Sequence, residues 1–286
     1  MLKCRNFAPR NMKKGIIILS CVALLMSSCA SEFTRVYKYG DTEAKYEYAK
    51  EFFARGKFQQ AISLLEEIVT IKKGSDEAQE CLYMLAMAQY CNGDFDAASE
   101  TFKKYGSSYP RGIYAEPAAF YVGQSLFESS PEPRLDQSPT NGAITAYQQF
   151  MDLFPDSKLR DKAQERLYVL YDKLIQKEYL SAELYYNLGG YFGNINQNDE
   201  SNYIASIVTA QNALKTYPYC SLREEFMLLI MKSKFQLAEN STEEKRVERY
   251  RDAEDECYGF INEFPESKNV PTAEKYIAKC KRVIKD

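Results

Sequence analysis

The chain has 286 residues, enough for one helical-repeat domain or for two ordinary domains. Its 37 basic and 40 acidic residues leave a formal net charge of −3, which argues against a nucleic-acid-binding protein because such proteins need a basic surface. The sequence contains no His, which excludes Ser-His-Asp and Cys-His catalysis and every His-ligated metal site.

Residues 1–28 predict an export signal, with Met12 as an alternative start. Two lysines follow Met12, and the apolar run of residues 16–26 is too short to span a bilayer. Two serines then precede Cys29, a pattern that resembles the lipobox of bacterial lipoproteins. It predicts that Cys29 becomes the lipidated N-terminus and that residues 29–41 form a lipidated tether. An ordinary secretory signal is the alternative.

The stretch from Glu80 to Pro110 predicts two helices joined by a tight corner at Gly93. Four of its residues fit positions 8, 20, 24 and 32 of the 34-residue tetratricopeptide (TPR) frame, namely Ala86, Ala98, Phe102 and Pro110. The two alanines allow the helices to approach closely, the aromatic ring fills the gap to the next pair, and the proline ends the second helix.

The same pattern recurs along the chain. Upstream, Gly56 marks a second corner, and downstream Gly123, Ala143 and Tyr147 occupy equivalent positions. An aromatic residue followed by proline closes several units, at Tyr109-Pro110, Phe154-Pro155, Tyr217-Pro218 and Phe264-Pro265. These repeats predict an all-α, TPR-like helical-repeat solenoid of about five to six helix pairs over residues 42–286.

Two polar segments predict surface loops within this solenoid, at residues 129–141 and 193–202. The distance between the second and third closures exceeds one repeat, so an extra helix is expected at 157–177. It either pairs with a helix at 179–193 or stands alone. The remaining helices are expected at 42–55, 58–72, 75–92, 95–109, 114–128, 140–154, 200–217, 220–238, 243–264 and 270–284.

The run from Lys173 to Tyr186, KLIQKEYLSAELYY, is the local feature most typical of a known family. Together with the lipobox and the divergent TPR units, it makes the chain resemble the BamD family of the β-barrel assembly machine over roughly residues 29–240. The segment 243–286 and the second loop extend beyond the family pattern. The first unit also lacks an aromatic-Pro closure and ends in Ile71-Lys72-Lys73.

The resemblance implies a non-enzymatic lipoprotein, anchored in the outer membrane and facing the periplasm. It implies binding to the periplasmic domain of the insertase BamA, to other subunits of the assembly machine and to unfolded outer-membrane proteins during their insertion. It implies no cofactor, no nucleic acid and contact with the membrane through the lipid anchor. The surface that would bind BamA is not implied by the sequence.

TPR solenoids bind extended ligands in a groove lined by the first helix of each pair. The groove positions of the first three units carry a set of large apolar side chains: Tyr46, Phe53, Tyr83, Met87, Tyr90, Phe120 and Phe127. Outer-membrane proteins of the resembled system typically end in an aromatic residue, which would suit such a groove. The alternative is that these side chains only pack the repeats together.

Two other functions fit parts of the sequence. A SusD-like carbohydrate-binding lipoprotein also has TPR helices, but that class stacks sugars on Trp and this chain has none. A lipid-anchored enzyme would need chemistry without His, and no nucleophile motif is present. Neither C-x-x-C pairs nor a metal-ligand pattern occurs, so no metal site is predicted. A Cys257–Cys280 disulfide remains open.

Overall fold

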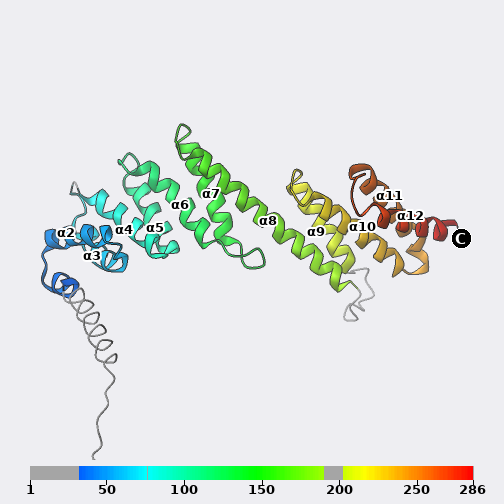
Figure 1. Cartoon of the computed structure of the whole chain (residues 1–286), viewed down its shortest axis with the longest axis horizontal. Coiled ribbons are helices and arrows are strands. Elements are labelled where there is room, and N and C mark those ends of the chain that lie inside the picture. The colour runs from blue at the N-terminus through cyan, green and yellow to red at the C-terminus, as the bar shows by residue number, and fades with distance from the viewer. Residues whose placement is uncertain (1–31, 76, 190–201, 286) are drawn as a thin grey trace, which may run out of the picture. The chain divides into compact units, whose positions relative to one another are not determined.

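The computed structural model describes residues 32–75, 77–189 and 202–285. The predicted signal peptide, Cys29 and nearly all of the predicted loop at 193–202 lie outside these residues. In the described part every regular element is a helix, which confirms the all-α, TPR-like helical-repeat fold (Figure 1). The labelled helices are α2 (Thr42–Ala54), α3 (Phe58–Ile71), α4 (Ala78–Asn92), α5 (Phe95–Ser108), α6 (Ala115–Ser129), α7 (Ser138–Leu153), α8 (Arg160–Leu188), α9 (Asn202–Thr216), α10 (Arg223–Glu239), α11 (Glu243–Glu263) and α12 (Val270–Lys285).

The chain forms two compact units. The first comprises Met1–Ser129 with Thr145–Arg160, and the second comprises Ser130–Ile144 with Asp161–Asp286. Within each unit, consecutive helices contact one another, as α2 to α6 do in the first and α9 to α12 do in the second. Helix-on-helix layering of this kind buries one stripe of each helix against its neighbours.

The predicted repeat frame accounts for the interior of the first unit. Ala98 and Phe102 are completely buried between α4, α5 and α6. The corner at Gly93 has a φ of 86°, a left-handed conformation that glycine adopts without steric cost, and its N–H caps α4. The closure residue Tyr109 packs its ring 5.4 Å from that of Tyr105.

The second unit is built on the same plan with longer helices. Its interior holds Phe226 of α10, Phe260 of α11 and Cys280 of α12, all completely buried. Cys257 and Cys280 are both buried free thiols, so the open question of a disulfide is answered in the negative for this structure.

Two sequence expectations need correction. The helices expected at 157–177 and 179–193 are one continuous helix, α8. It contains no Gly or Pro that would end it, and Ile175 and Ala182 are buried two turns apart on one face. Residues 32–39, assigned to the tether, form a helix whose Val36 is 4% exposed in the core of the first unit. The expected loop at 129–141 is present as residues 130–137.

Candidate functional site

All seven predicted groove side chains lie on first helices of the first unit, on α2, α4 and α6. The structure places them against neighbouring helices, and none is fully exposed. Tyr46 and Phe120 are only 3% and 2% exposed. These two lie in the core of this structure and offer almost no surface to a ligand. The remaining five, namely Phe53, Tyr83, Met87, Tyr90 and Phe127, are half-buried, and we call them the aromatic face.

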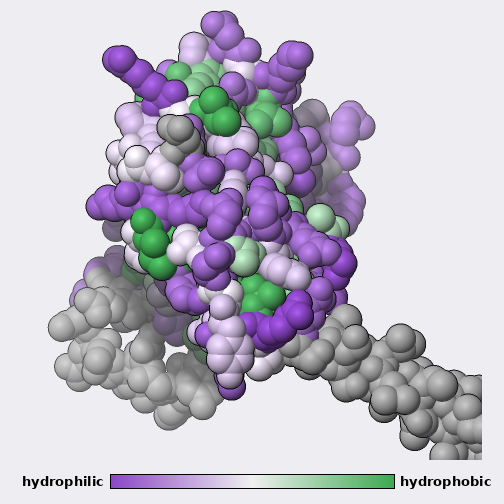
Figure 2. Space-filling view, turned by 90° about the vertical axis from the view of Figure 1, so that its left-hand side faces the viewer, coloured by the Kyte–Doolittle hydropathy of each residue, from purple (hydrophilic) through white to green (hydrophobic). Residues whose placement is uncertain are grey.

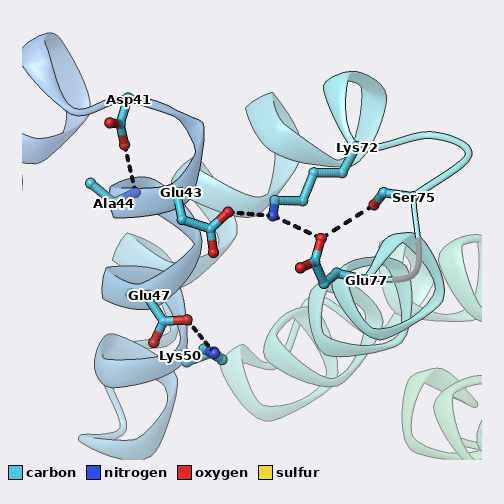
Figure 3. A network of polar contacts seen from close by, with 8 residues as sticks. All are labelled: Asp41, Glu43, Ala44, Glu47, Lys50, Lys72, Ser75 and Glu77. Carbon is cyan, nitrogen blue, oxygen red and sulfur yellow. Dashed lines mark hydrogen bonds and ion pairs between the residues drawn. The ribbon is translucent and has the colours of Figure 1, made fainter.

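Charged groups lie around the Tyr46 ring. Figure 3 shows the ion pairs that Lys72 forms with Glu43 and Glu77 and that Lys50 forms with Glu47. The Lys72 ammonium lies 4.4 Å from the Tyr46 ring centroid and 2.9 and 3.0 Å from carboxylate oxygens of Glu43 and Glu77. Lys50 lies 4.3 Å from the same ring centroid. Burial, with a hydrogen bond to Glu80, raises the pKa of the Tyr46 hydroxyl well above its usual value.

This network occupies the place where the first unit lacks an aromatic-Pro closure. Lys72 directs a cation at the face of the Tyr46 ring, an attraction that grows when the cation is removed from water, and its side chain is only 7% exposed. The α2 end of the expected groove therefore carries charged side chains that pair with one another around the Tyr46 ring.

Tyr83 is the centre of the aromatic face. Its ring stacks on that of Tyr114 with centroids 4.4 Å apart and planes 7° from parallel. It also meets the rings of Phe102 and Tyr105 edge-on, at 5.8 and 5.9 Å. Burial raises the pKa of Tyr83 to about 12. Much of this ring is already used in packing between α4, α5 and the start of α6.

The rest of the aromatic face is less enclosed. Tyr90 meets Phe95 and Tyr121 edge-on at 5.5 and 5.1 Å, and Phe53 meets Phe58 at 5.5 Å. Met87 packs on the same cluster as Tyr83. The part of each side chain that remains accessible can offer apolar area to an extended ligand. Binding of a peptide at the aromatic face stays a prediction.

The second unit contains an apolar pocket that sequence reasoning missed. It has a volume of about 600 Å³ and lies between α8 and the turn that follows α9. Tyr168 on α8 is 67% exposed and Tyr219 in the turn is 99% exposed. Ser221 donates a hydrogen bond of 2.8 Å to Asp172 at its edge. The only signal in the sequence is a second aromatic residue, Tyr219, directly after the Tyr217-Pro218 closure. We call this site the α8 pocket.

Comparison with known proteins identifies the family. Residues 39–200, more than half of the chain, match the YfiO family, whose description is outer membrane lipoprotein. The chain belongs to the YfiO, or BamD, family. Helices α2 to α8 fall within the matched residues, and the helix of residues 32–39 precedes them.

One curated relative is the outer membrane protein assembly factor BamD of Caulobacter vibrioides. The two chains are 22% identical over 171 residues, which cover 59% of this chain and 56% of the relative. The match thus spans little more than half of the relative's length.

Among solved structures, similar ones are TPR-like repeats of a kinesin light chain from Podospora anserina, at 12% identity, and the TPR2AB domain of yeast Sti1 in complex with an HSP90 peptide, at 11%. The first covers 79% of this chain and 96% of that chain with a TM-score of 0.32. The second covers 84% and 98% with a TM-score of 0.36.

The run of residues 173–186, by which the chain resembles the BamD family, packs two of its tyrosines against α9 and α10 and leaves Leu184 and Tyr185 exposed. The rings of Tyr179 and Tyr186 meet Phe226 and Tyr203 edge-on at 5.6 and 5.9 Å. Lys173 donates to the carbonyl oxygen of Ser130 at 3.1 Å and so ties loop 130–137 to α8. Burial lowers the pKa of the Lys173 ammonium. Within the described ranges, each helix is too short or too polar to span a bilayer.

Proposed function

We propose that this protein is a non-enzymatic lipoprotein subunit of the β-barrel assembly machine. In this proposal Cys29 anchors it to the outer membrane, facing the periplasm, and its helical repeats bind the periplasmic domain of BamA, other subunits of the machine and unfolded outer-membrane proteins. The observation that carries the proposal is the family match over residues 39–200. The curated relative, named as an outer membrane protein assembly factor, supports the same role.

The physical character of the surface supports a role in binding rather than catalysis. Rigid helical repeats present aromatic side chains at low cost in conformational entropy, and such residues dominate the energy of many interfaces. We propose the aromatic face as the site where an unfolded client lays its apolar, aromatic C-terminal segment. The α8 pocket, with two strongly exposed tyrosines, is the competing location within the second unit.

A crosslinked pull-down tests the function. The affinity-tagged chain is crosslinked in intact envelopes, purified under denaturing conditions, and its partners are identified by mass spectrometry. We expect a BamA-type insertase and outer-membrane β-barrel clients to be enriched over a tagged, unrelated lipoprotein. Enrichment of polysaccharide-uptake proteins without any insertase would contradict the proposal and favour a carbohydrate-binding lipoprotein.

The client site is tested by fluorescence anisotropy with a labelled peptide ending in an aromatic residue, compared with the same peptide lacking that residue. Replacing Tyr83 and Tyr90 together with alanine should weaken binding of the labelled peptide by about 1–3 kcal/mol. Because Tyr83 also stacks within the unit, a second variant, Met87→Gln, changes the aromatic face with less loss of packing volume. Binding at the face is mainly apolar and should depend weakly on salt.

The matched control replaces the two exposed tyrosines of the α8 pocket, Tyr168→Ser and Tyr219→Ser, which should leave stability nearly unchanged. Loss of binding only in the aromatic-face variants supports that location. A loss restricted to the pocket variants would move the client site to the second unit. Equal affinity of every variant, or of both peptides, would remove client recognition from the proposed function.

A further inference from the structure

The first described residue of the helix at 32–39, Glu32, is close in sequence to the proposed lipid anchor. Only three peptide units separate Cys29 from Glu32, and at full extension they span at most roughly 11 Å. The acyl chains of a lipidated Cys29 would lie in the hydrocarbon region, so the cysteine would sit at headgroup level. The headgroup layer of one leaflet is itself roughly 5–8 Å thick. With such an anchor, Glu32, the first described residue of this helix, would lie at, or just above, the membrane surface.

The helix is packed against the first unit by one of its faces. Phe33 meets Phe52 of α2 edge-on at 6.0 Å, and Val36 is 4% exposed among the residues of α2 and α3. Glu32 pairs with Arg55 at 3.6 Å. The turn to α2 is equally tight, because a Cβ atom at Gly40 would lie 2.6 Å from the carbonyl oxygen of Val36. The helix is thus part of the folded unit and not a loose spacer.

The opposite face of the helix is left to solvent, and its chemistry suits phospholipid headgroups. Tyr39 is 83% exposed and Tyr37 is 45% exposed. Arg35 and Lys38 are exposed beside them. Arg35 also donates a 3.5 Å hydrogen bond to the hydroxyl of Tyr48 on α2, and among the described residues Lys38 has no ion pair or hydrogen bond. Tyrosine concentrates at membrane–water interfaces, and lysine and arginine attract anionic lipid headgroups.

The surrounding surface favours a contact with headgroups over insertion into the acyl region. Figure 2 shows the end of the molecule that carries α2 and α3 in Figure 1, and hydrophilic residues cover most of it. The hydrophobic residues visible there among the described ones are separated from each other and form no broad apolar patch. A surface of this kind can rest on a polar layer but gains little from entering hydrocarbon.

We propose that the outward face of residues 34–39, made by Arg35, Tyr37, Lys38 and Tyr39, rests on the phospholipid headgroups of the membrane that holds the Cys29 anchor. This rests on the proposed lipoprotein function. The contact gives the first unit a fixed orientation relative to the membrane, because the helix is packed into that unit. A flexible tether of the same length would hold the unit near the membrane without orienting it.

The absence of Trp from the sequence allows a direct test. Tyr39→Trp introduces a single indole fluorophore on the proposed face, and the full lipidated chain is reconstituted into vesicles of phosphatidylethanolamine and phosphatidylglycerol with bromines at shallow acyl positions. Ile113→Trp is the matched control, because Ile113 is 75% exposed on the same unit, in the turn between α5 and α6. Co-flotation with the vesicles is measured for both proteins.

We expect the brominated lipid to reduce the fluorescence of the Tyr39→Trp protein and to shift its emission to the blue, and to leave the emission of the Ile113→Trp protein unchanged. Combining Tyr39→Trp with Arg35→Glu and Lys38→Glu should weaken the quenching, most strongly at low salt.

Three outcomes would contradict parts of this inference. Co-flotation of the Tyr39→Trp protein without quenching would overturn the membrane contact and leave the anchor intact. Failure to co-float would overturn the anchor at Cys29 and the contact together. Equal quenching of the Tyr39→Trp and Ile113→Trp proteins would also contradict a contact confined to this helix.

Discussion

The close packing of Gly123 in α6 against Tyr147 in α7 gives a sharp test of the repeat frame. A Cβ atom at Gly123 would lie 2.8–2.9 Å from three carbons of the Tyr147 ring, well inside ordinary van der Waals contact. The ring cannot easily move away, because it is completely buried and its hydroxyl donates a 2.9 Å hydrogen bond to Gln124. We therefore expect Gly123→Ala to destabilise the first unit.

The size of the effect follows from two opposing contributions. Alanine in place of glycine within a helix stabilises it by up to about 1 kcal/mol. Forcing a methyl group into a filled interior costs about 1–3 kcal/mol, and a strained or broken bond from Tyr147 to Gln124 would add about 1 kcal/mol. The expected net change in the free energy of unfolding is a loss of about 1–2 kcal/mol.

The assay is urea unfolding followed by circular dichroism, with Gly106→Ala as the matched control. Gly106 is also helical, in α5 of the same unit, and nothing lies within 4 Å of a Cβ atom placed there. We expect the control to be neutral or stabilised by less than about 1 kcal/mol. If the two alanine variants shift the unfolding midpoint equally and in the same direction, α6 and α7 do not pack as described.

Two further predictions concern charges and thiols. The hydrogen bond to Glu43 raises the pKa of Lys72, and Lys72 lowers the pKa of Glu77. Lys72 thus adds stability below about pH 10, and this stability is lost as the pH rises through the raised pKa of Lys72. Glu77 adds stability above about pH 4, and this stability is lost as the pH falls through the lowered pKa of Glu77. In urea titrations, Lys72→Met should lower the free energy of unfolding mainly between about pH 4 and pH 10. An equally large loss of unfolding free energy at pH 2 would contradict the pairing. In native alkylation at pH 8, exposed Cys91 should react and buried Cys257 should not, because burial raises the pKa of Cys257 to about 12; mass spectrometry that finds equal labelling would refute its burial.

The sequence predicts much of the fold because TPR packing depends on few, local features. Glycine at a corner, small residues at two helix crossings and an aromatic residue before proline are each required by steric fit, and residues such as Gly93 and Ala98 lie where the frame places them. Continuity of α8 was less predictable, since the closures set the repeat length but no local signal marks a helix that continues through a repeat boundary. The sequence does not predict the helix at 32–39, because its apolar pattern is short and the helix packs on α2 and α3 only in the folded chain.

The repeat frame predicts less about the candidate site than about the fold. The repeat frame assigns Tyr46, Tyr83 and Phe120 to one surface, but it says nothing about which neighbours cover each of them. Lys72 approaches the Tyr46 ring from a position far along the chain, and Tyr114 stacks on Tyr83 from the next repeat. The α8 pocket likewise depends on residues brought together only by folding.

The central claim, a role in assembling outer-membrane β-barrels, is tested most directly by depletion in the native organism. Folded barrel proteins are quantified in the outer membrane by their heat-modifiable electrophoretic mobility as the protein is depleted. We predict a fall in several folded barrel proteins, restored by the wild-type chain and not by Cys29→Ala. Unchanged levels of folded barrel proteins after complete depletion would contradict the claim.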